Sequence, residues 1–167
     1  MIYTPVCDAR PSFAIAPHRN MPSRPLRKKE FEDLADFRYA LRRFLRFSEE
    51  SARAEGLTPL QYQLLLQVKG ASARDWALVG ELAERLQMQP HGAVALVSRC
   101  ERAGLVRRAA NRDDRRRVQI HLSPAGDRAV RRIAERNRQE LVSLAPVLDA
   151  IAGAGEKGAR RAAARAR

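Results

Sequence analysis

The chain has 167 residues, the usual size of one compact domain, and 45% of them are hydrophobic, enough to bury a core. No apolar run approaches the ~20 residues that a membrane-spanning helix needs. Lysine and arginine number 32 against 19 acidic residues, for a net charge of +13. Almost all of this positive charge is arginine, whose planar guanidinium matches phosphates and guanine edges. The composition therefore favours a nucleic-acid ligand.

The excess charge is confined to three segments. Residues 1–29 carry a net charge of +5, residues 107–117 carry +4, and residues 156–167 carry +4, so the rest of the chain is balanced. A uniformly solvated surface would not concentrate charge in this way, although basic tails alone are common. The internal segment is therefore the more informative of the three.

The chain begins with an irregular segment and a long helix. Residues 1–26 contain five prolines and no periodicity, which predicts a disordered basic extension, and Met21 is a candidate alternative start. From residue 27 to about residue 54, apolar side chains recur every three or four positions. This stripe predicts an amphipathic helix that ends at Gly56.

A second helix is predicted for residues 60–69. Thr58 and Gln61 have the spacing of a capping box, and Pro59 suits a first helical position. Trp76 is expected in the loop that follows, where its ring packs rather than binds. The side chains that we expect this helix to bury are Leu60, Leu64, Leu65 and Val68.

Two shorter helices follow, over residues 79–86 and 90–103, separated by a turn at residues 87–89. Pro90 suits the first turn of the later helix, and Gly104 its end. A short helix, a tight turn and a second helix predict a helix-turn-helix. The core face of the later helix is expected to consist of Ala93, Val94, Val97 and Cys100.

The periodicity then changes to that of strands. Residues 105–108 and 118–122 read as two strands joined by a charged tip, which predicts a β-hairpin. A last helix begins at Pro124, breaks near Pro146 and extends to about residue 155. Residues 156–167 are Ala/Arg/Gly low-complexity sequence. The fold class is thus mainly α with a small β-hairpin wing.

The face of the helix over residues 90–103 that lies opposite its core resembles a DNA-reading surface. Small side chains let a helix sink into the ~12 Å major groove, Arg99 can reach guanine or phosphate, and His91 lies at the helix start, where base edges are usually met. The plainer alternative is a solvated face that happens to hold two arginines. The candidate residues are Pro90, His91, Gly92, Ala95, Ser98, Arg99 and Arg102.

The hairpin tip supplies a second candidate contact. A projecting arginine suits the negative potential of a narrow minor groove, and a neighbouring carboxylate can brace it, as we expect Asp114 to do for Arg116. The alternative is a charged turn that only keeps a strand edge soluble. The candidate residues of the tip are Arg112, Asp114, Arg115 and Arg116.

Several of these segments together resemble the MarR family of winged helix-turn-helix regulators. They are Val79-Gly80-Glu81-Leu82-Ala83-Glu84-Arg85-Leu86, then Ala93-Val94-x-Leu96-Val97-Ser98-Arg99, Glu101-Arg102-Ala103-Gly104-Leu105-Val106, and Asp114-x-Arg116-x-Val118-x-Ile120-x-Leu122-Ser123-Pro124-Ala125-Gly126. The resemblance covers about residues 57–126. The sequence departs from the family at Cys100, where Leu is frequent, at Arg117, where a small residue is frequent, and in its long N-terminal extension.

The resemblance implies an intertwined helical homodimer with two winged lobes on DNA. Residues 27–56 would form a first dimerisation helix, residues 57–123 the DNA-binding lobe, and residues 124–155 the C-terminal dimerisation helices. Pro90 to Arg102 would read the major groove, and Arg116 would enter the minor groove. A two-fold dimer requires a pseudo-palindromic operator with half-sites ~10 base pairs apart. Repression is the expected outcome, because a bound regulator excludes polymerase from a promoter.

The resemblance also implies a small aromatic or phenolic effector, bound between the dimer helices and the DNA-binding lobe. The residues available to line such a crevice are Phe37, Phe44, Tyr62 and Trp76, although aromatics at helical spacing are more often core. Redox sensing is disfavoured, because Cys7 lies in the predicted tail and Cys100 reads as a buried small hydrophobe.

Other functions fit the sequence less well. His18, His91 and His121 are scattered, without a nucleophile motif, a phosphate-binding glycine loop, a metal-ligand spacing or a cofactor motif, so we expect no enzyme. An architectural protein that binds DNA without sequence preference is the main alternative. RNA binding is disfavoured, because no aromatic side chains that could stack on bases accompany the basic segments. The two cysteines and the absence of a signal segment favour a cytoplasmic, nucleoid-associated protein.

Overall fold

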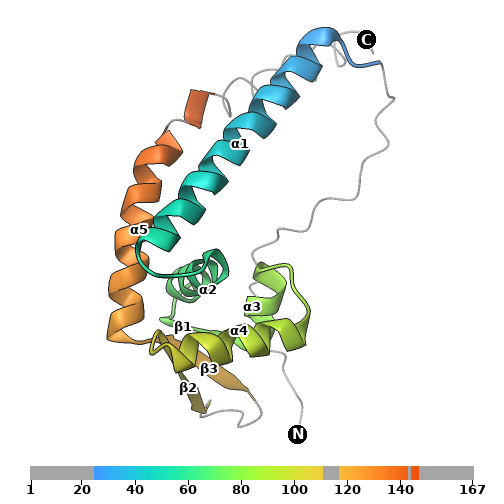
Figure 1. The fold of residues 1–167 in the computed structure, drawn as a ribbon. Helices are drawn as coiled ribbons and strands as arrows, with labels where there is room; N and C mark the ends of the chain where they lie inside the picture. Colours follow the sequence, from blue (N-terminus) through green and yellow to red (C-terminus); the bar gives the residue numbers. More distant parts are fainter. Residues whose placement is uncertain (1–24, 111–116, 143, 147–167) are drawn as a thin grey trace, which may run out of the picture.

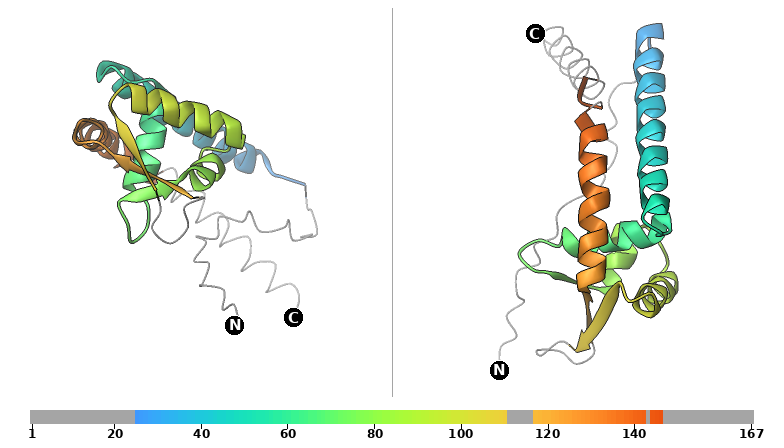
Figure 2. Two further views of the ribbon diagram at one scale, coloured as in Figure 1. Left: turned by 90° about the horizontal axis from the view of Figure 1, so that it is seen from below. Right: turned by 60° about the vertical axis from the view of Figure 1, so that its left-hand side comes forward.

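A computed structural model of the chain describes residues 25–110, 117–142 and 144–146. Two long helices lie side by side and antiparallel, and they project from a lobe built of three shorter helices and a small sheet (Figures 1 and 2). The elements in chain order are α1 (Lys28–Ala54), α2 (Pro59–Lys69), β1 (Trp76–Leu78), α3 (Val79–Arg85), α4 (Pro90–Arg102), β2 (Val106–Ala110), β3 (Val118–Leu122) and α5 (Pro124–Val142).

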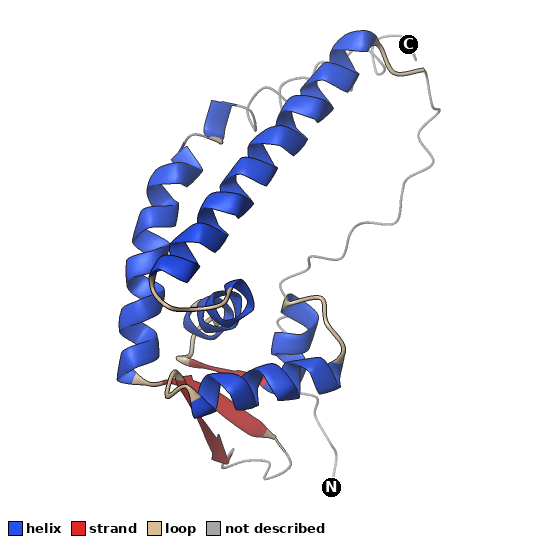
Figure 3. Ribbon diagram, in the orientation of Figure 1, coloured by secondary structure: helices blue, strands red, loops and turns tan. Residues whose placement is uncertain are grey.

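The predicted fold class is confirmed, with one strand more than expected. β2 and β3 form the predicted hairpin, and β1 pairs antiparallel with the other edge of β3, so the strand order is β1-β3-β2 (Figure 3). Trp76, which was expected in a loop, lies in β1 opposite His121. Three residues are too few to show an alternating pattern, so this strand depends on its partner rather than on a local signal.

Local signals at the start of α2 act as the sequence predicts. The hydroxyl of Thr58 accepts a hydrogen bond from the N–H of Gln61 at 3.2 Å, and the Gln61 side chain accepts one from the N–H of Thr58 at 2.8 Å. Pro59 occupies the first turn, and Gly56, with φ 74°, ends the preceding helix. The capping box therefore sets the corner between α1 and α2.

The predicted burial of α2 is wrong at Leu60. This side chain is 42% exposed, whereas Tyr62, which was assigned to a ligand crevice, is buried. At 3.6 residues per turn, Leu60 lies about a third of a turn from the centre of the buried face, which is formed by Tyr62, Leu64, Leu65 and Val68. The core of the lobe gathers side chains from α2, α3, α4, the sheet and α5.

The start of α5 is interlocked with the end of α4. The Ser123 hydroxyl donates a hydrogen bond to the carbonyl oxygen of Gly104 at 2.6 Å and accepts one from the N–H of Gly126 at 3.0 Å. The N–H of Ser123 donates to the carbonyl oxygen of Leu105 at 2.9 Å. Gly126 lies directly on that peptide, and a Cβ there would overlap the Leu105 carbonyl oxygen. We call these four residues the α4–α5 joint.

Polar contacts tie α5 to the ends of α1 and α2. Asn137 is buried, and its Nδ2 donates hydrogen bonds to the hydroxyls of Ser48 and Tyr62, both at 2.9 Å. Glu55, just after α1, accepts from Arg132 Nε at 2.7 Å and pairs with Arg136 Nη2 at 2.9 Å. Hydrogen bonding and the charges of these guanidinium groups hold the pKa of the Glu55 carboxyl below its ordinary value, against the effect of desolvation.

No helix in the described ranges is long and apolar enough to cross a lipid bilayer.

The α4–α5 joint predicts a large effect of Gly126→Ala. The added methyl group must displace backbone rather than a flexible side chain, so the free energy of unfolding should fall by about 1–3 kcal/mol or more. Denaturant unfolding followed by circular dichroism measures it. Gly80→Ala is the matched control, because a Cβ at that position of α3 meets open space. A Gly126→Ala protein as stable as the Gly80→Ala protein would contradict the interlock.

Glu55 predicts a pH-dependent contribution to stability. Its pKa is lower in the folded chain than the 4.5 of a free side chain, so its contribution is present above pH 4.5 and is lost as the pH falls through the folded value. The destabilisation caused by Glu55→Gln should therefore be larger at pH 7 than at pH 3.5, as measured by urea unfolding. Glu50→Gln, which removes an exposed carboxylate paired with Arg46, controls for the lost charge. Equal destabilisation by Glu55→Gln at both pH values would contradict a pH-dependent contribution of Glu55 to stability.

Candidate nucleic-acid interface

A short turn fixes the angle between α3 and α4. Gln87 has φ 51°, a left-handed conformation that costs a residue with a side chain roughly 1–2 kcal/mol. Its amide donates a hydrogen bond to the carbonyl oxygen of Glu84 at 2.7 Å, which compensates in part. The N–H of Met88 donates to the carbonyl oxygen of Ala83 at 2.9 Å. Pro90 then begins α4, so the predicted helix-turn-helix geometry is present.

None of the seven predicted α4 residues is buried in the core. In the described chain, no ion pair holds the exposed guanidinium groups of Arg99 and Arg102, which remain available to a ligand. The exposed residues are Pro90, His91, Ala95, Arg99 and Arg102, and Gly92 and Ser98 are partly buried. We call this set the outer face of α4.

Val94 was assigned to the core, and this prediction is wrong. Its side chain is 49% exposed beside the outer face, and Leu96 is buried in its place. Counting three, four and seven residues from Ala93 leads to Leu96, Val97 and Cys100, so strict helical periodicity was the signal that could have found both residues. An apolar side chain is thereby added to the candidate interface.

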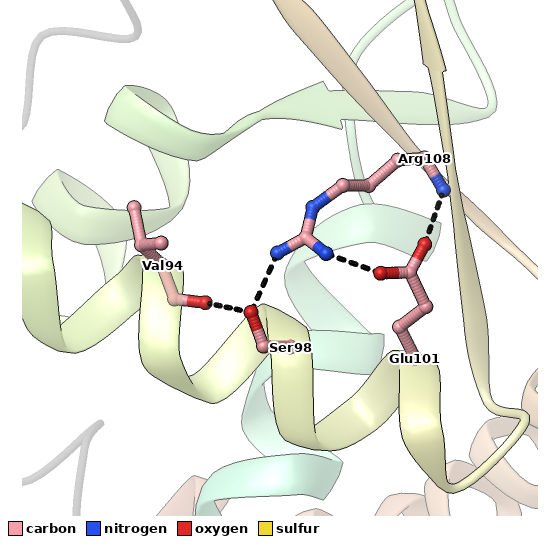
Figure 4. Close-up of polar contacts among 4 residues, drawn as sticks. All are labelled: Val94, Ser98, Glu101 and Arg108. Carbon is pink, nitrogen blue, oxygen red and sulfur yellow. Dashed lines mark hydrogen bonds and ion pairs between the residues drawn. The ribbon is translucent and has the colours of Figure 1, made fainter.

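Ser98 is bound to the wing rather than free (Figure 4). Its hydroxyl donates to the carbonyl oxygen of Val94 at 3.0 Å and accepts from Arg108 Nη2 at 2.8 Å. Arg108 Nη1 also pairs with Glu101 Oε2, and the backbone N–H of Arg108 donates to Glu101 Oε1 at 3.1 Å. Sequence reasoning missed Arg108 and Glu101, because their link between α4 and β2 depends on tertiary structure.

The hairpin presents further arginines. Arg107 is exposed on β2 and Arg117 is exposed just before β3. The predicted tip contacts, which are Arg112, Asp114, Arg115 and Arg116, lie outside the described residues. The described arginines of the basic segment therefore belong to the same lobe as α4.

The four predicted crevice residues come from α1, α2 and β1. Phe37 and Phe44 are half-buried on α1, and the Tyr62 hydroxyl accepts the hydrogen bond from Asn137. Burial raises the pKa of the Tyr62 hydroxyl, although the bond to Asn137 lowers it. The Trp76 ring carries the Arg74 guanidinium 4.3 Å from its centre. The expectation that Trp76 packs fits this contact.

A hollow of about 450 Å³ lies elsewhere, between the sheet and the start of α5. None of the four predicted aromatic residues lines it, so the aromatic crevice stays a prediction. The side chains that line this hollow include groups of both charges, among them Lys69, Asp75, Arg107, His121 and Asp127. Within the described residues, no three His, Cys, Asp or Glu side chains are grouped so that they could hold a metal ion.

Cys100 lies on the buried face of α4, as expected, and is fully buried. Burial raises the pKa of its thiol to about 11, against a smaller opposite effect of the Arg99 charge. A thiol in this state is a packing group rather than a nucleophile. Cys7 lies outside the described residues.

The fold and this surface define a winged helix-turn-helix protein. Residues 55–117 match the model of the MarR family, and the motif order and the fold agree with that match.

Individual proteins are similar to the chain in sequence or in fold. The HTH-type transcriptional repressor MdtR of Bacillus subtilis is 32% identical over 78 residues, which are 47% of this chain, and the chain spans about half (48%) of that repressor's length. AbsC, a MarR family transcriptional regulator from Streptomyces coelicolor, superposes with a TM-score of 0.58 at 22% identity, over 84% of this chain and 93% of AbsC. CouR from Rhodococcus jostii, bound to p-coumaroyl-CoA, gives 0.52 at 23% identity, over 58% of this chain and 66% of CouR.

The burial of Cys100 predicts an unreactive thiol. With a pKa of about 11, only about one thiol in a thousand is ionised at pH 8, and access is blocked as well. In a Cys7→Ser protein, reaction with Ellman's reagent at pH 8 should be slow in buffer and fast in guanidinium chloride. Equal rates in the two conditions would show that Cys100 is exposed and would reopen a redox role.

Proposed function

We propose that the chain is a transcriptional regulator that reads double-stranded DNA in sequence-specific fashion, as a homodimer on a pseudo-palindromic operator, and that it acts as a ligand-responsive repressor. The observation that carries the proposal is the outer face of α4, a set of small and basic side chains held beside an arginine-rich wing. The repressor MdtR, to which 78 residues of the chain are 32% identical, supports repression over activation.

The dimensions of α4 suit a major groove. The helix has 13 residues and is therefore about 20 Å long. Gly92 and Ala95 leave room for close approach to the groove floor, and His91 lies in the first turn, where recognition helices meet base edges. Val94 adds an exposed methyl pair that suits contact with the 5-methyl group of thymine. Together these side chains offer polar and apolar readout on one helix.

Arg99 and Arg102 supply the positive charge of this face. A guanidinium can bind guanine O6 and N7 in bidentate fashion or neutralise a phosphate, and only the first of these distinguishes one sequence from another. From the sequence we propose that Arg112, Asp114, Arg115 and Arg116 serve the wing tip, with Arg116 in the minor groove. The outer face of α4 in the major groove and Arg116 in the minor groove would then lie in adjacent grooves of one half-site.

Exposed apolar side chains support a homodimer. Single exposed apolar residues are ordinary, but a group of them on two neighbouring helices supports an interaction site. A two-fold dimer would cover members of this group and present two copies of α4 to the two half-sites. The exposed apolar side chains of α1 and α5 are Phe31, Leu34, Tyr39, Leu45, Leu141 and Val142.

We also propose a small aromatic or phenolic effector. CouR, whose structure holds p-coumaroyl-CoA, shows that a protein of this fold can bind an aromatic acyl thioester. In this chain Phe37 and Phe44, two residues of the proposed crevice, are partly buried aromatic side chains on α1. An effector would act by favouring one spacing of the two lobes over another.

The test is the affinity for the DNA upstream of the gene and for a scrambled DNA of equal length, measured by fluorescence anisotropy at ~150 mM salt, where phosphate binding alone is weak. A preference of about 1,000-fold or more supports a sequence-reading regulator. A random-sequence selection covers an operator that lies elsewhere. Equal binding to every DNA in both experiments would favour an architectural protein instead.

Arg99→Ala separates readout from charge. If Arg99 binds guanine, its loss should weaken operator binding by about 1–3 kcal/mol and should affect scrambled DNA much less. Arg46→Ala is the matched control, because it removes the same charge from an exposed position on α1. Equal losses on both DNAs, with a shallower salt dependence, would make Arg99 a phosphate contact.

A further inference from the structure

We propose that Arg108 is a positioning residue that clamps the wing to α4 through Glu101 and Ser98, so that both elements meet DNA as one rigid surface. The inference rests on the DNA-binding function proposed above. It assigns to Arg108 and Glu101 a part in recognition that requires no contact between Glu101 and DNA.

The clamp contains a bond that does not depend on the arginine side chain. β2 is an edge strand, since the sheet order is β1-β3-β2, and the N–H of Arg108 donates to Glu101 Oε1 at 3.1 Å. The second carboxylate oxygen, Oε2, pairs with Arg108 Nη1. Glu101 thus binds the backbone and the side chain of the same residue, which restricts how β2 can move relative to α4 (Figure 4).

The guanidinium also reaches the outer face of α4. Arg108 Nη2 donates to the Ser98 hydroxyl at 2.8 Å, and that hydroxyl donates to the carbonyl oxygen of Val94 one turn earlier. The hydroxyl of Ser98 is therefore engaged on both sides. We assign Ser98 to the clamp rather than to base readout, in place of its predicted role.

The positioning role explains why an acidic residue, Glu101, lies near a DNA-binding face. A carboxylate beside a DNA-binding face repels phosphates, so on electrostatic grounds alone it weakens DNA binding. Its side chain is 36% exposed and that of Arg108 is 33% exposed, so neither charge is fully shielded. The benefit that offsets the repulsion is the fixed geometry, because an arginine–carboxylate pair with two or more hydrogen bonds restricts orientation as well as distance.

These two effects of Glu101 predict opposite results for Glu101→Gln. Electrostatics alone predicts tighter binding, because one negative charge is lost. The clamp predicts weaker binding to an operator, because glutamine replaces one of the two acceptor oxygens by an NH2 donor, which would face an N–H group of Arg108. The sign of the change therefore distinguishes the clamp from a simple charge effect.

The experiment measures the affinities of the full-length protein for a selected operator and for scrambled DNA at several salt concentrations. The variants are Glu101→Gln, Arg108→Gln, the double variant and Arg108→Lys. We expect each single glutamine variant to weaken operator binding roughly 10-fold, with a smaller effect on scrambled DNA. The double variant should bind the operator no more weakly than the weaker-binding single variant, since both substitutions break the same set of contacts. Arg108→Lys should also lose discrimination, because lysine keeps the charge without the planar fork.

Glu84→Gln is the matched control. Glu84 is an exposed acid on α3 in the same lobe, so its replacement removes the same charge without touching the clamp. We expect this variant to bind both DNAs as tightly as the wild type or more tightly. Thermal unfolding of every variant establishes that the lobe is folded at the assay temperature.

Two results would overturn the inference. If Glu101→Gln tightens operator binding as Glu84→Gln does, the pair does not position the wing. The second result is that Arg108→Gln weakens binding to both DNAs equally and lowers the slope of log affinity against log salt concentration by about one, while Arg108→Lys binds as the wild type does. Arg108 would then be a phosphate contact. Should a glutamine variant unfold, Arg108→Lys still decides between these cases. A wild-type protein without sequence preference would instead count against the proposed function itself.

Discussion

The close approach of the first turn of α5 to the backbone after α4 is the constraint on which the rest of the arrangement depends. At the α4–α5 joint, Gly126 rests on the peptide of Leu105, and the Ser123 hydroxyl closes the gap to Gly104. Any larger residue in place of Gly126 would push the two segments apart. Since β3 enters this joint and α5 leaves it, the wing, the end of α4 and the long helix share one small block of backbone.

The two long helices and the lobe are therefore joined through polar contacts as well as through the core. Glu55 bonds two arginines of α5, and Asn137 joins α1, α2 and α5 at a buried point. The oxygen of the Asn137 amide has no hydrogen-bond partner among the described residues, although it is buried. A shift of α5 relative to α1 would change these contacts first, because hydrogen bonds tolerate displacement less than apolar packing does.

Much of the fold could be predicted from the sequence, where a short-range signal decides the outcome. The Thr58 box, Pro90 and Gly56 mark the ends of elements through local geometry, and these ends are where the structure has them. Burial was misjudged at Leu60 and Val94, because apolar character was given more weight than helical angle. In the candidate interface, the exposure of α4 was predictable from periodicity, but the engagement of Ser98 was not. Its partner Arg108 is ten residues away along the chain, and only the pairing of β2 with α4 brings the two together.

One feature of α1 affects how stability is distributed in the molecule. Its 27 residues include only two buried ones, Ser51 and Ala52, both in the last turn. The N-terminal half of this helix thus receives little support from the lobe to which it is attached, and an unsupported helical segment of about 13 residues is marginal in water. If a second copy covers that half, part of the free energy of folding belongs to the association step. The order of α1 would then vary with protein concentration, while the compact lobe would keep its structure at any dilution.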